Sequence, residues 1–514
     1  MITFIGAIIL LIVGYLVYGR IVSRVFGEEN LRPTPAITKA DGVDYVPMSP
    51  WRIFLVQFLN IAGMGPIFGA IMGIFFGPSA FLWIVFGTIF AGGVHDYMTG
   101  MLSIRKGGAS LPEIVGDELG NGIKQFMRGL SLVLLILLTT SFLSGPAALL
   151  QNLLELPTWD FFMDLIEPDD DYQLGFFSRI DPNIPITWVC VIFAYYVLAT
   201  ILPVDKLIGR FYPLFGGILL FMGAGIMVVM LGWHASEMPE LSDGLYNRMN
   251  GGTTPLFPIM FVSIACGAIS GFHGTQSPIM ARCITSEKQG RFIFYGAMVA
   301  EGILALIWAA AAGTIFADPE QGLYGIDGLQ AFAAAHKGEN IAALVVDHVS
   351  RTWLGKIGGL LAIIGVIAAP ITSGDTALRS ARLIVADFLH VSQKPIRFRL
   401  YIAIPLFICV FSMLFVNFNV VWRYFAWTNQ LLATISLWAI TYYLMRRQRC
   451  YWISLIPAVF MTMVVLSFVL VAPTGSYIPG QGLPMFLSYA IAAIIDIALC
   501  IVFAYHTKHT PILR

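Results

Sequence analysis

The sequence predicts an all-α integral membrane protein with about 13 transmembrane helices in a single domain, residues 1–514. Of its 514 residues, 58% are hydrophobic and only 12% are charged, whereas soluble domains carry about twice that charged fraction. The mean hydropathy is +0.79. Apolar segments of about 20 residues, the length a helix needs to cross a bilayer, recur along the whole chain.

The apolar segments place the predicted spans. They lie at approximately 2–19, 51–76, 79–102, 126–151, 186–203, 213–233, 257–281, 292–316, 354–377, 400–420, 424–445, 452–472 and 485–506. The first has no basic residue before it and no small-residue cleavage site after it, so a retained helix is expected rather than a signal peptide. The segments between spans are too short to form a soluble domain.

Two pieces outside the spans are expected to be helical. The stretch SLPEIVGDELG begins with the capping-box pattern of Ser110 and Glu113, which predicts a short amphipathic helix on the cytoplasmic side. Residues 326–352 read as two short external helices that could cover the mouth of a pathway.

The charged residues predict an orientation. Lys and Arg together number 30, as do Asp and Glu, and no basic run occurs, so no nucleic-acid partner is expected. With the N-terminus outside, all basic residues fall on the cytoplasmic side except Arg179, Arg248, Lys337, Arg351, Lys356 and Arg423. The positive-inside rule therefore predicts an external N-terminus and a cytoplasmic C-terminus.

The six cysteines show neither CxxC spacing nor a His/Cys cluster. Neither disulfides nor structural zinc is expected, and no cofactor is predicted. The sequence does not define an oligomeric state.

Two of the predicted spans are interrupted. The second contains NIAGMGPIFG, with Gly63, Gly65 and Pro66, and the seventh contains SIACGAISGFHGTQSPIMARC, with Gly271 and Pro278. Glycine and proline weaken a helix, and unwound backbone inside a bilayer is tolerated only against protein or a water-filled cavity. The alternative is that the glycines only allow close helix packing.

The spacing of the two interruptions indicates a transporter. They are five spans apart and so lie in helices of opposite direction, which is typical of an inverted repeat whose broken helices form the substrate site. The predicted repeats are residues 50–234 and 256–447, followed by extra helices at 452–506. Polar residues near the breaks complete the candidate substrate site, which comprises Gly63, Gly65, Pro66, Ser270, Gly271, His273, Thr275, Gln276, Ser277 and Asn429.

Other polar residues in the spans are candidates for ion coupling or gating. His95 and Asp96 form a proton relay or gate, or else an interfacial pair that ends the third span. In the ninth span, Thr372, Ser373, Asp375 and Thr376 offer oxygen atoms for a small cation, while Asp375 could instead carry a proton or simply pair with Arg379. Asn429 and Gln430 line a cavity or bond a neighbouring helix, and Glu301 is a further buried acid.

Seven motifs give the chain a family resemblance. They are DGVDYVP (41–47), IAGMGPIFG (61–69), AGGVHDYM (91–98), GGASLPEI (107–114), SIACGAISGFH (263–273), TSGDTALRSARLIVADFL (372–389) and WTNQLLA (427–433). With these motifs the chain resembles the carbon starvation protein A family of bacterial inner-membrane transporters. The chain is shorter than the long peptide-linked members, and its GTQSPIMARC resembles the compact branch.

The resemblance implies a fold and an activity. It implies a secondary active importer of the amino acid, polyamine and organocation superfamily, with a LeuT-like five-plus-five inverted repeat, which takes up nutrients during carbon starvation. Peptides are the substrate of some members and pyruvate of others. By analogy, the ninth span faces the second across a cation site at Thr372, Ser373 and Thr376, and the coupling ion is H⁺ or Na⁺.

The expected function is thus ion-coupled import of a peptide or a small carboxylate in the bacterial inner membrane. A channel or sensor without coupled transport is the alternative, although neither a filter motif nor a signalling domain is visible in the sequence. A membrane enzyme would need His95, Asp96, His273 and Asp375 to converge, and no nucleophile motif or metal spacing supports it.

Overall fold

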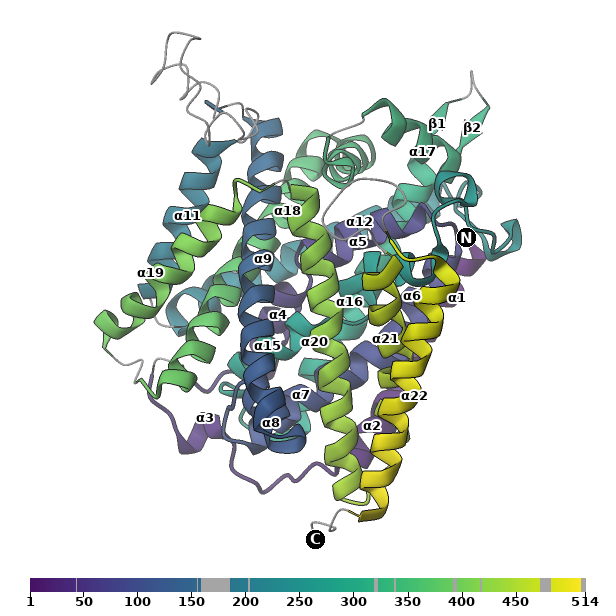
Figure 1. Ribbon diagram of the computed structural model, residues 1–514. Helices are drawn as coiled ribbons and strands as arrows, with labels where there is room; N and C mark the ends of the chain where they lie inside the picture. Colours follow the sequence, from purple (N-terminus) through teal and green to yellow (C-terminus); the bar gives the residue numbers. More distant parts are fainter. Residues whose placement is uncertain are drawn as a thin grey trace, which may run out of the picture.

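The computed structural model is a bundle of α-helices (Figure 1). It describes residues 1–514 except 43, 155, 159–184, 202–203, 319–321, 337–338, 392–394, 417, 472–481 and 510–514. The strands of the described part are β1 (Ala317–Asp318) and β2 (Leu323–Tyr324), which pair antiparallel. The predicted all-α class is therefore confirmed.

The helices follow one another along the chain with short connections. Those of the first half are α1 (Ile2–Val13), α2 (Gly19–Phe26), α3 (Pro35–Thr38), α4 (Pro50–Ile61), α5 (Met64–Ile74), α6 (Ser79–Phe86), α7 (Gly93–Arg105), α8 (Leu111–Leu119), α9 (Asn121–Leu153), α11 (Ile186–Ile201) and α12 (Val204–Trp233). Those of the second half are α13 (Leu256–Ser263), α14 (Ala265–Ala268), α15 (Gly271–Ala281), α16 (Gly296–Ile315), α17 (Gly325–Ala335), α18 (Ile341–Leu389), α19 (Ile396–Met413), α20 (Phe418–Arg446), α21 (Trp452–Val471) and α22 (Met485–His509).

Many of these helices are suited to a bilayer. In the described residues, eight helices are long and apolar enough to cross a membrane, and the pair α4 and α5, bent by 48°, makes a ninth crossing if it is counted as one. The first of them runs over Ile2–Phe26 through a π-helical segment and is longer than the predicted 2–19. The total of about 13 spans stays a prediction.

Burial separates a central group of helices from an outer one. In the most apolar window of α22, 22% of the residues are buried, and in that of the α1–α2 span 28%, against 78% for the spans that contain α7 and α16. All eleven residues of α15 are buried. Helix α15 is therefore surrounded by protein, while α1 and α22 present apolar side chains outward, as a lipid environment requires.

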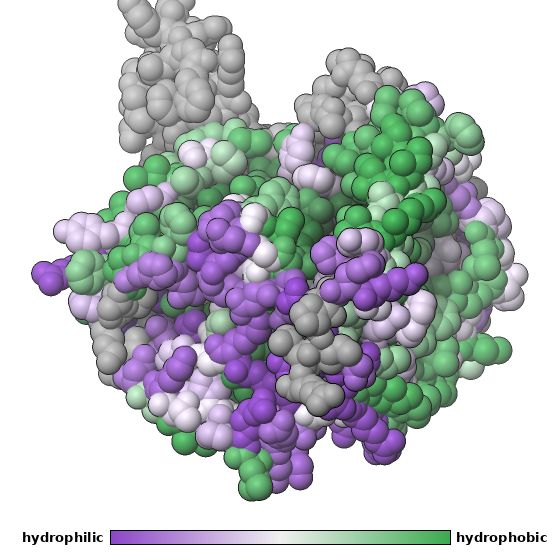
Figure 2. Space-filling view, turned by 60° about the horizontal axis from the view of Figure 1, so that its bottom comes forward, coloured by the Kyte–Doolittle hydropathy of each residue, from purple (hydrophilic) through white to green (hydrophobic). Residues whose placement is uncertain are grey.

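The two ends of the bundle differ. The N-terminus, β1, β2 and α17 lie at one end, and α3, α8 and the C-terminal end of α22 lie at the other (Figure 1). Seen from the C-terminal end, hydrophilic residues gather over the middle of the face and hydrophobic residues lie around much of its rim (Figure 2). Ion pairs such as Lys106 with Asp117 and Arg446 with Glu118 belong to α8 and its surroundings.

The two predicted short helical regions are present, but the predicted capping box is not formed. Ser110 is the N-cap residue of α8, yet its side chain makes no capping hydrogen bond. Glu113 instead forms ion pairs with Lys124 and Arg128 of α9, because two nearby cations attract this carboxylate more strongly than a backbone N–H does. The region predicted to be external forms α17 and the first part of α18, which ends in a kink at Gly355.

Candidate functional site

The two interrupted spans break where glycine and proline predicted. Helix α4 ends at Ile61 and α5 begins at Met64, whereas the seventh span breaks twice, at Ile264 and at Ile269–Ser270. The breaks also touch each other, because a Cβ added to Gly65 would overlap the sulfur of Cys266. Gly65 therefore has a packing role in addition to its effect on the backbone.

Side chains of α20 satisfy the backbone that the second break leaves free. Asn429 Oδ1 accepts hydrogen bonds from the Phe272 N–H at 2.8 Å and from the Ser270 hydroxyl at 3.1 Å. Gln430 Nε2 donates to the Ile269 carbonyl at 3.0 Å. Asn429 thus caps the N-terminus of α15 from another helix, and buried backbone groups that would each cost free energy are paired.

We expect Asn429→Ala to lower the free energy of unfolding by about 2 kcal/mol, because it leaves the buried Phe272 N–H without an acceptor. Thr434→Ala on the same helix is the matched control, since the Thr434 hydroxyl only donates to the Gln430 carbonyl of its own helix. Denaturation midpoints in mixed micelles measure both changes. Equal destabilisation by the two substitutions would contradict a capping role for Asn429.

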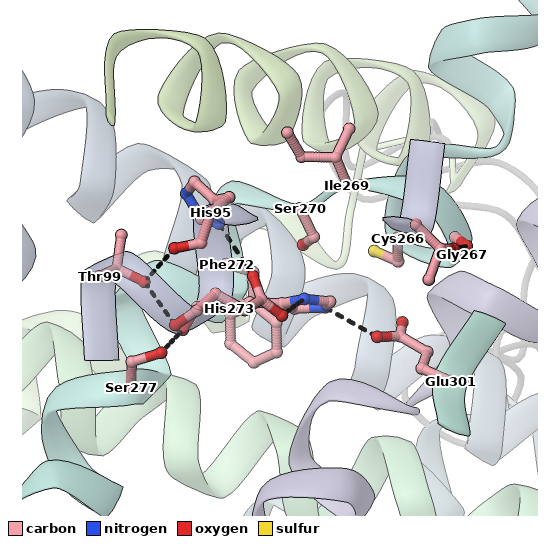
Figure 3. A network of polar contacts seen from close by, with 12 residues as sticks. His95, Thr99, Cys266, Gly267, Ile269, Ser270, Phe272, His273, Ser277 and Glu301 are labelled. Atoms are coloured by element: carbon pink, nitrogen blue, oxygen red, sulfur yellow. Dashed lines mark hydrogen bonds and ion pairs between the residues drawn. The ribbon is translucent and has the colours of Figure 1, made fainter. Parts of the chain in front are cut away.

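A row of buried titratable groups crosses the bundle beside α15. Asp96 of α7 lies between two histidines, with Oδ1 at 2.9 Å from His95 Nδ1 and Oδ2 at 2.8 Å from His273 Nδ1. The other ring nitrogen of His273, Nε2, lies 3.4 Å from Oε2 of Glu301 on α16. All four side chains are completely buried, and Figure 3 shows His95 and Glu301 on opposite sides of His273.

The proton positions in this row follow from its geometry. A carboxylate only accepts hydrogen bonds, so each Nδ1 that faces Asp96 carries a proton. A neutral His273 with its proton on Nδ1 presents a lone pair at Nε2, so the 3.4 Å contact with Glu301 Oε2 is favourable only when one of the two groups holds a proton there. With a proton there and an ionised Asp96, the row carries one net negative charge.

The row is not arranged as a metal site. In the described part of the chain, no three His, Cys, Asp or Glu side chains are grouped so that they could hold a metal ion. Two Nδ1 atoms face carboxylate oxygens rather than a shared centre. The arrangement suits the transfer of protons through Asp96, which joins the two histidines by hydrogen bonds.

The predicted hydroxyls of the ninth span face the end of α4. Ser373 Oγ lies 2.8 Å from the Asn60 carbonyl and 3.3 Å from the Leu59 carbonyl, and Thr376 Oγ lies 3.3 Å from Asn60 Oδ1. Thr372 Oγ donates to carbonyls of its own helix, at Ala368 and Ala369. Ser373, Thr376 and α4 thus gather oxygen atoms of the kind that a small hard cation prefers.

Asp375 lies on a different face of α18. Its Oδ2 accepts a hydrogen bond of 2.7 Å from the Tyr212 hydroxyl of α12. Arg379, one turn further along, donates to the Ala199 carbonyl of α11. The sequence placed Asp375 with Ser373 and Thr376 in one candidate cation site. In the structure, the carboxylate of Asp375 faces α12, whereas the hydroxyls of Ser373 and Thr376 face α4.

The remaining predicted substrate residues differ in whether their polar groups are already paired within the protein. The hydroxyls of Thr275 and Ser277 donate to carbonyls of their own helix, at Phe272 and His273. Gln276 is fully buried, and neither its Oε1 nor its Nε2 has a hydrogen-bond partner among the described residues. Gly63 lies close to other side chains, since a Cβ there would be 2.8 Å from Phe142 and 3.1 Å from Ser373 Oγ.

Two polar residues of α4 are buried near its broken end, although the sequence did not single them out. Gln57 has both amide atoms unpaired among the described residues, and Asn60 has an unpaired Nδ2, and both are fully buried. The sequence did carry a signal for them, because an amide side chain inside an apolar spanning segment is often functional. Glu301 was noted in the sequence only as an isolated acid, and the structure joins it to His273.

The chain has relatives among known membrane proteins. The family model described as carbon starvation protein CstA matches residues 1–163, 181–346 and 319–468. An uncharacterized membrane protein of Haemophilus influenzae is 43% identical over 347 residues, which cover 62% of this chain and 92% of that protein. Peptide transporter CstA of Campylobacter jejuni is 27% identical over 562 residues, which cover 90% of this chain and 78% of that transporter.

A further relative and two solved structures complete the comparison. The pyruvate/proton symporter BtsT of Escherichia coli is 28% identical over 346 residues, 59% of this chain and 47% of BtsT. A mutant of the manganese transporter of Eremococcus coleocola aligns with a TM-score of 0.54 at 15% identity, over 91% of this chain and 97% of its own. MhsT in complex with L-phenylalanine aligns with a TM-score of 0.54 at 14% identity, over 88% of this chain and 98% of the MhsT chain. At these identities the structures show a shared fold alone.

Proposed function

Because the chain belongs to the carbon starvation protein CstA family, whose members are transporters and not enzymes, we propose that it is a proton-coupled importer of a peptide or of a small carboxylate such as pyruvate. Relatives named as a peptide transporter and as a pyruvate/proton symporter support both substrate classes. The site is proposed to lie at the two helix breaks.

The row His95, Asp96, His273 and Glu301 carries the proposal of proton coupling. Its net negative charge is costly in a buried environment, so taking up one more proton stabilises the row. His273 is part of α15, the half-helix that begins at the break. Protonation is therefore proposed to change the position of α15 and, with it, access to the site.

Unpaired buried amides on α4 and α15 support a substrate site at these two helices. The amide groups of Gln57 and Gln276, together with Asn60 Nδ2, offer hydrogen bonds that no described residue accepts or donates. A bound substrate would satisfy them, and the N-terminus of α15 with its partial positive charge suits a carboxylate. Pyruvate and the C-terminus of a peptide share that group.

The proposed topology follows the sequence prediction. We propose about 13 spans, a LeuT-like pair of repeats at 50–234 and 256–447, and additional helices at 452–506. The start of α1 and the end of α22 lie at opposite ends of the bundle, which supports an odd number of crossings (Figure 1). In the bacterial inner membrane, the end with α8 and the C-terminus is proposed to face the cytoplasm.

A sodium-coupled cycle is the second candidate. The oxygen atoms of Ser373, Thr376 and the Asn60 carbonyl support it, because they converge between α18 and the break in α4. In that case Na⁺ would join the two helices that the break allows to move, with Thr372 nearby.

Uptake by proteoliposomes tests the coupling ion. We expect labelled pyruvate or a labelled dipeptide to accumulate when the outside is more acidic than the inside, and a sodium gradient at constant pH to have no effect. Accumulation driven by sodium alone would favour the second candidate. Uptake of neither substrate class under either gradient would refute the importer, and an ion current without accumulation would indicate a channel.

A further inference from the structure

Helix α8 lies over the second nitrogen of the His95 ring. Nδ1 of this ring faces Asp96, so Nε2 is the nitrogen at which the ring can gain or lose a proton. His95 Nε2 is buried and has no hydrogen-bond partner among the described residues. A Cβ added to Gly274 of α15 would lie 3.3 Å from His95 Nε2 and 3.1 Å from Leu111 Cδ2. Leu111, the first residue of α8, therefore packs against the same point of α15 as this nitrogen.

The two sides of α8 differ in polarity. Its inner side is apolar and at most 2% exposed, and it comprises Leu111, Ile114 and Val115. Its outer side carries Asp117, whose side chain is 55% exposed. Helix α8 lies at one end of the bundle (Figure 1), so its outer side meets the water at that end. Its inner side therefore forms an apolar layer between this water and His95.

Ion pairs fix α8 to three other helices. Lys106, which directly follows α7, has its Nζ 2.7 Å from Asp117 Oδ2 and 3.4 Å from Glu118 Oε1. Arg446 at the end of α20 lies 3.4 Å from Glu118 Oε2. The pairs of Glu113 with α9 add to these contacts. Helix α8 is thus held in place from its outer side, while its inner side only packs against α15 and its neighbours.

The two ends of α15 are connected differently. Just after its last turn, Arg282 donates to the Gly108 carbonyl through Nε at 3.0 Å and Nη2 at 2.9 Å, which ties this end to the segment that leads into α8. At its other end, extended backbone at Ile269 and Ser270 joins α15 to α14. A tilt about Arg282 would therefore leave α8 in place and carry Gly274, about 12 Å along the helix, away from Leu111.

We propose that Leu111 and Gly274 form a gate that closes His95 Nε2 from the water beside α8, and that a tilt of α15 opens it. The proposal rests on the proposed proton-coupled import, in which the end with α8 faces the cytoplasm. A proton on His95 then reaches that water only after α15 has moved. Release of the proton is thereby tied to the same motion that changes access to the substrate site. Leu111 is a positioning residue, since it carries no proton itself.

Histidine modification by diethyl pyrocarbonate tests the gate in the purified full-length protein. The reagent attaches to an unprotonated imidazole nitrogen that it can reach, and mass spectrometry of peptides gives the rate at each histidine. His506, which is exposed near the end of α22, is the internal standard. We expect Leu111→Ala to raise the rate at His95 about tenfold, because the cavity left by the leucine opens a path to Nε2. The rate at His506 should not change.

A second variant tests the contacts that hold α8. Glu118→Gln weakens its pairs with Lys106 and Arg446 and should raise the rate at His95 about threefold, the effect of losing a partly exposed ion pair. Asp347→Asn is the matched control, because it breaks a pair with Arg351 within α18. It should leave the rate at His95 unchanged.

Leu219→Ala is the matched control for Leu111→Ala. Leu219 is fully buried on α12, which carries no residue of the row, so its loss should leave the rate at His95 within about twofold of the wild type. An equal rise in this control, an unchanged rate in Leu111→Ala or in Glu118→Gln, or wild-type His95 modified as fast as His506 would each overturn the gate. The assay needs neither substrate nor gradient, so its failure is distinct from a failure of coupled import.

Discussion

Asp96→Asn should abolish proton-driven accumulation of substrate, with an initial rate about 100-fold below that of the wild type, the magnitude expected when one partner of a buried charged network is lost. In the proposed cycle, the row that contains Asp96 carries one net negative charge and becomes neutral when it takes up a proton. With Asn it begins neutral, so a further proton would create a buried positive charge. The driving force for proton uptake is thereby lost.

The same substitution should spare the binding of substrate. Asn has nearly the shape of Asp and can still accept a hydrogen bond from one histidine, while the other histidine must change its tautomer. Counterflow of labelled substrate between equal pools, which needs no proton gradient, should therefore stay within about threefold of the wild type. Loss of counterflow together with accumulation would show that Asp96 is needed for the substrate site or the fold.

Asp496→Asn is the matched control for this experiment. Asp496 is a buried acid of α22 with an unpaired Oδ1 among the described residues, and it lies outside the row. We expect its replacement to leave accumulation within about twofold of the wild type, since distant sites act independently. A loss of accumulation equal to that of Asp96→Asn would mean that removal of any buried acid impairs transport.

The helix breaks could be predicted from the sequence because the signal is local. Glycine and proline in NIAGMGPIFG and in SIACGAISGFH weaken the helix where they stand, and the chain breaks at Ala62–Gly63 and at Ile269–Ser270. The same local reasoning placed α8 correctly. It was wrong about the capping box, because Lys124 and Arg128 of another helix bind Glu113.

The arrangement of the site could not be predicted, because it depends on which helices meet. His273 and Asp96 are 177 residues apart, and the sequence assigned them to separate substrate and ion sites. Likewise, the Leu59 and Asn60 carbonyls that face Ser373 are backbone groups, which every residue has. Ionisable residues in apolar helices signalled a function, but only packing joined them into one row.

Gly271→Ala should lower the free energy of unfolding by about 3 kcal/mol, which combines overpacking with lost hydrogen bonds. The new Cβ would lie 2.5 Å from the Asn429 carbonyl oxygen, 2.6 Å from Leu432 Cβ and 2.8 Å from the Ala433 nitrogen. Two of these are backbone atoms of α20 and cannot rotate away. Helix α15 must therefore separate from α20 at the point where Asn429 caps it.

Gly217→Ala on α12 separates this steric effect from the general effect of removing a glycine. A Cβ at Gly217 meets nothing within 4 Å, so alanine should stabilise that helix by up to about 1 kcal/mol. Denaturation midpoints in mixed micelles measure both variants, and uptake assays should show that only Gly271→Ala impairs transport. If Gly271→Ala were as stable as the wild type, the contact between α15 and α20 would be looser than the structure shows. The role of Gly271 would then be to give the backbone the flexibility that the helix break needs, and not to allow close packing of α15 against α20.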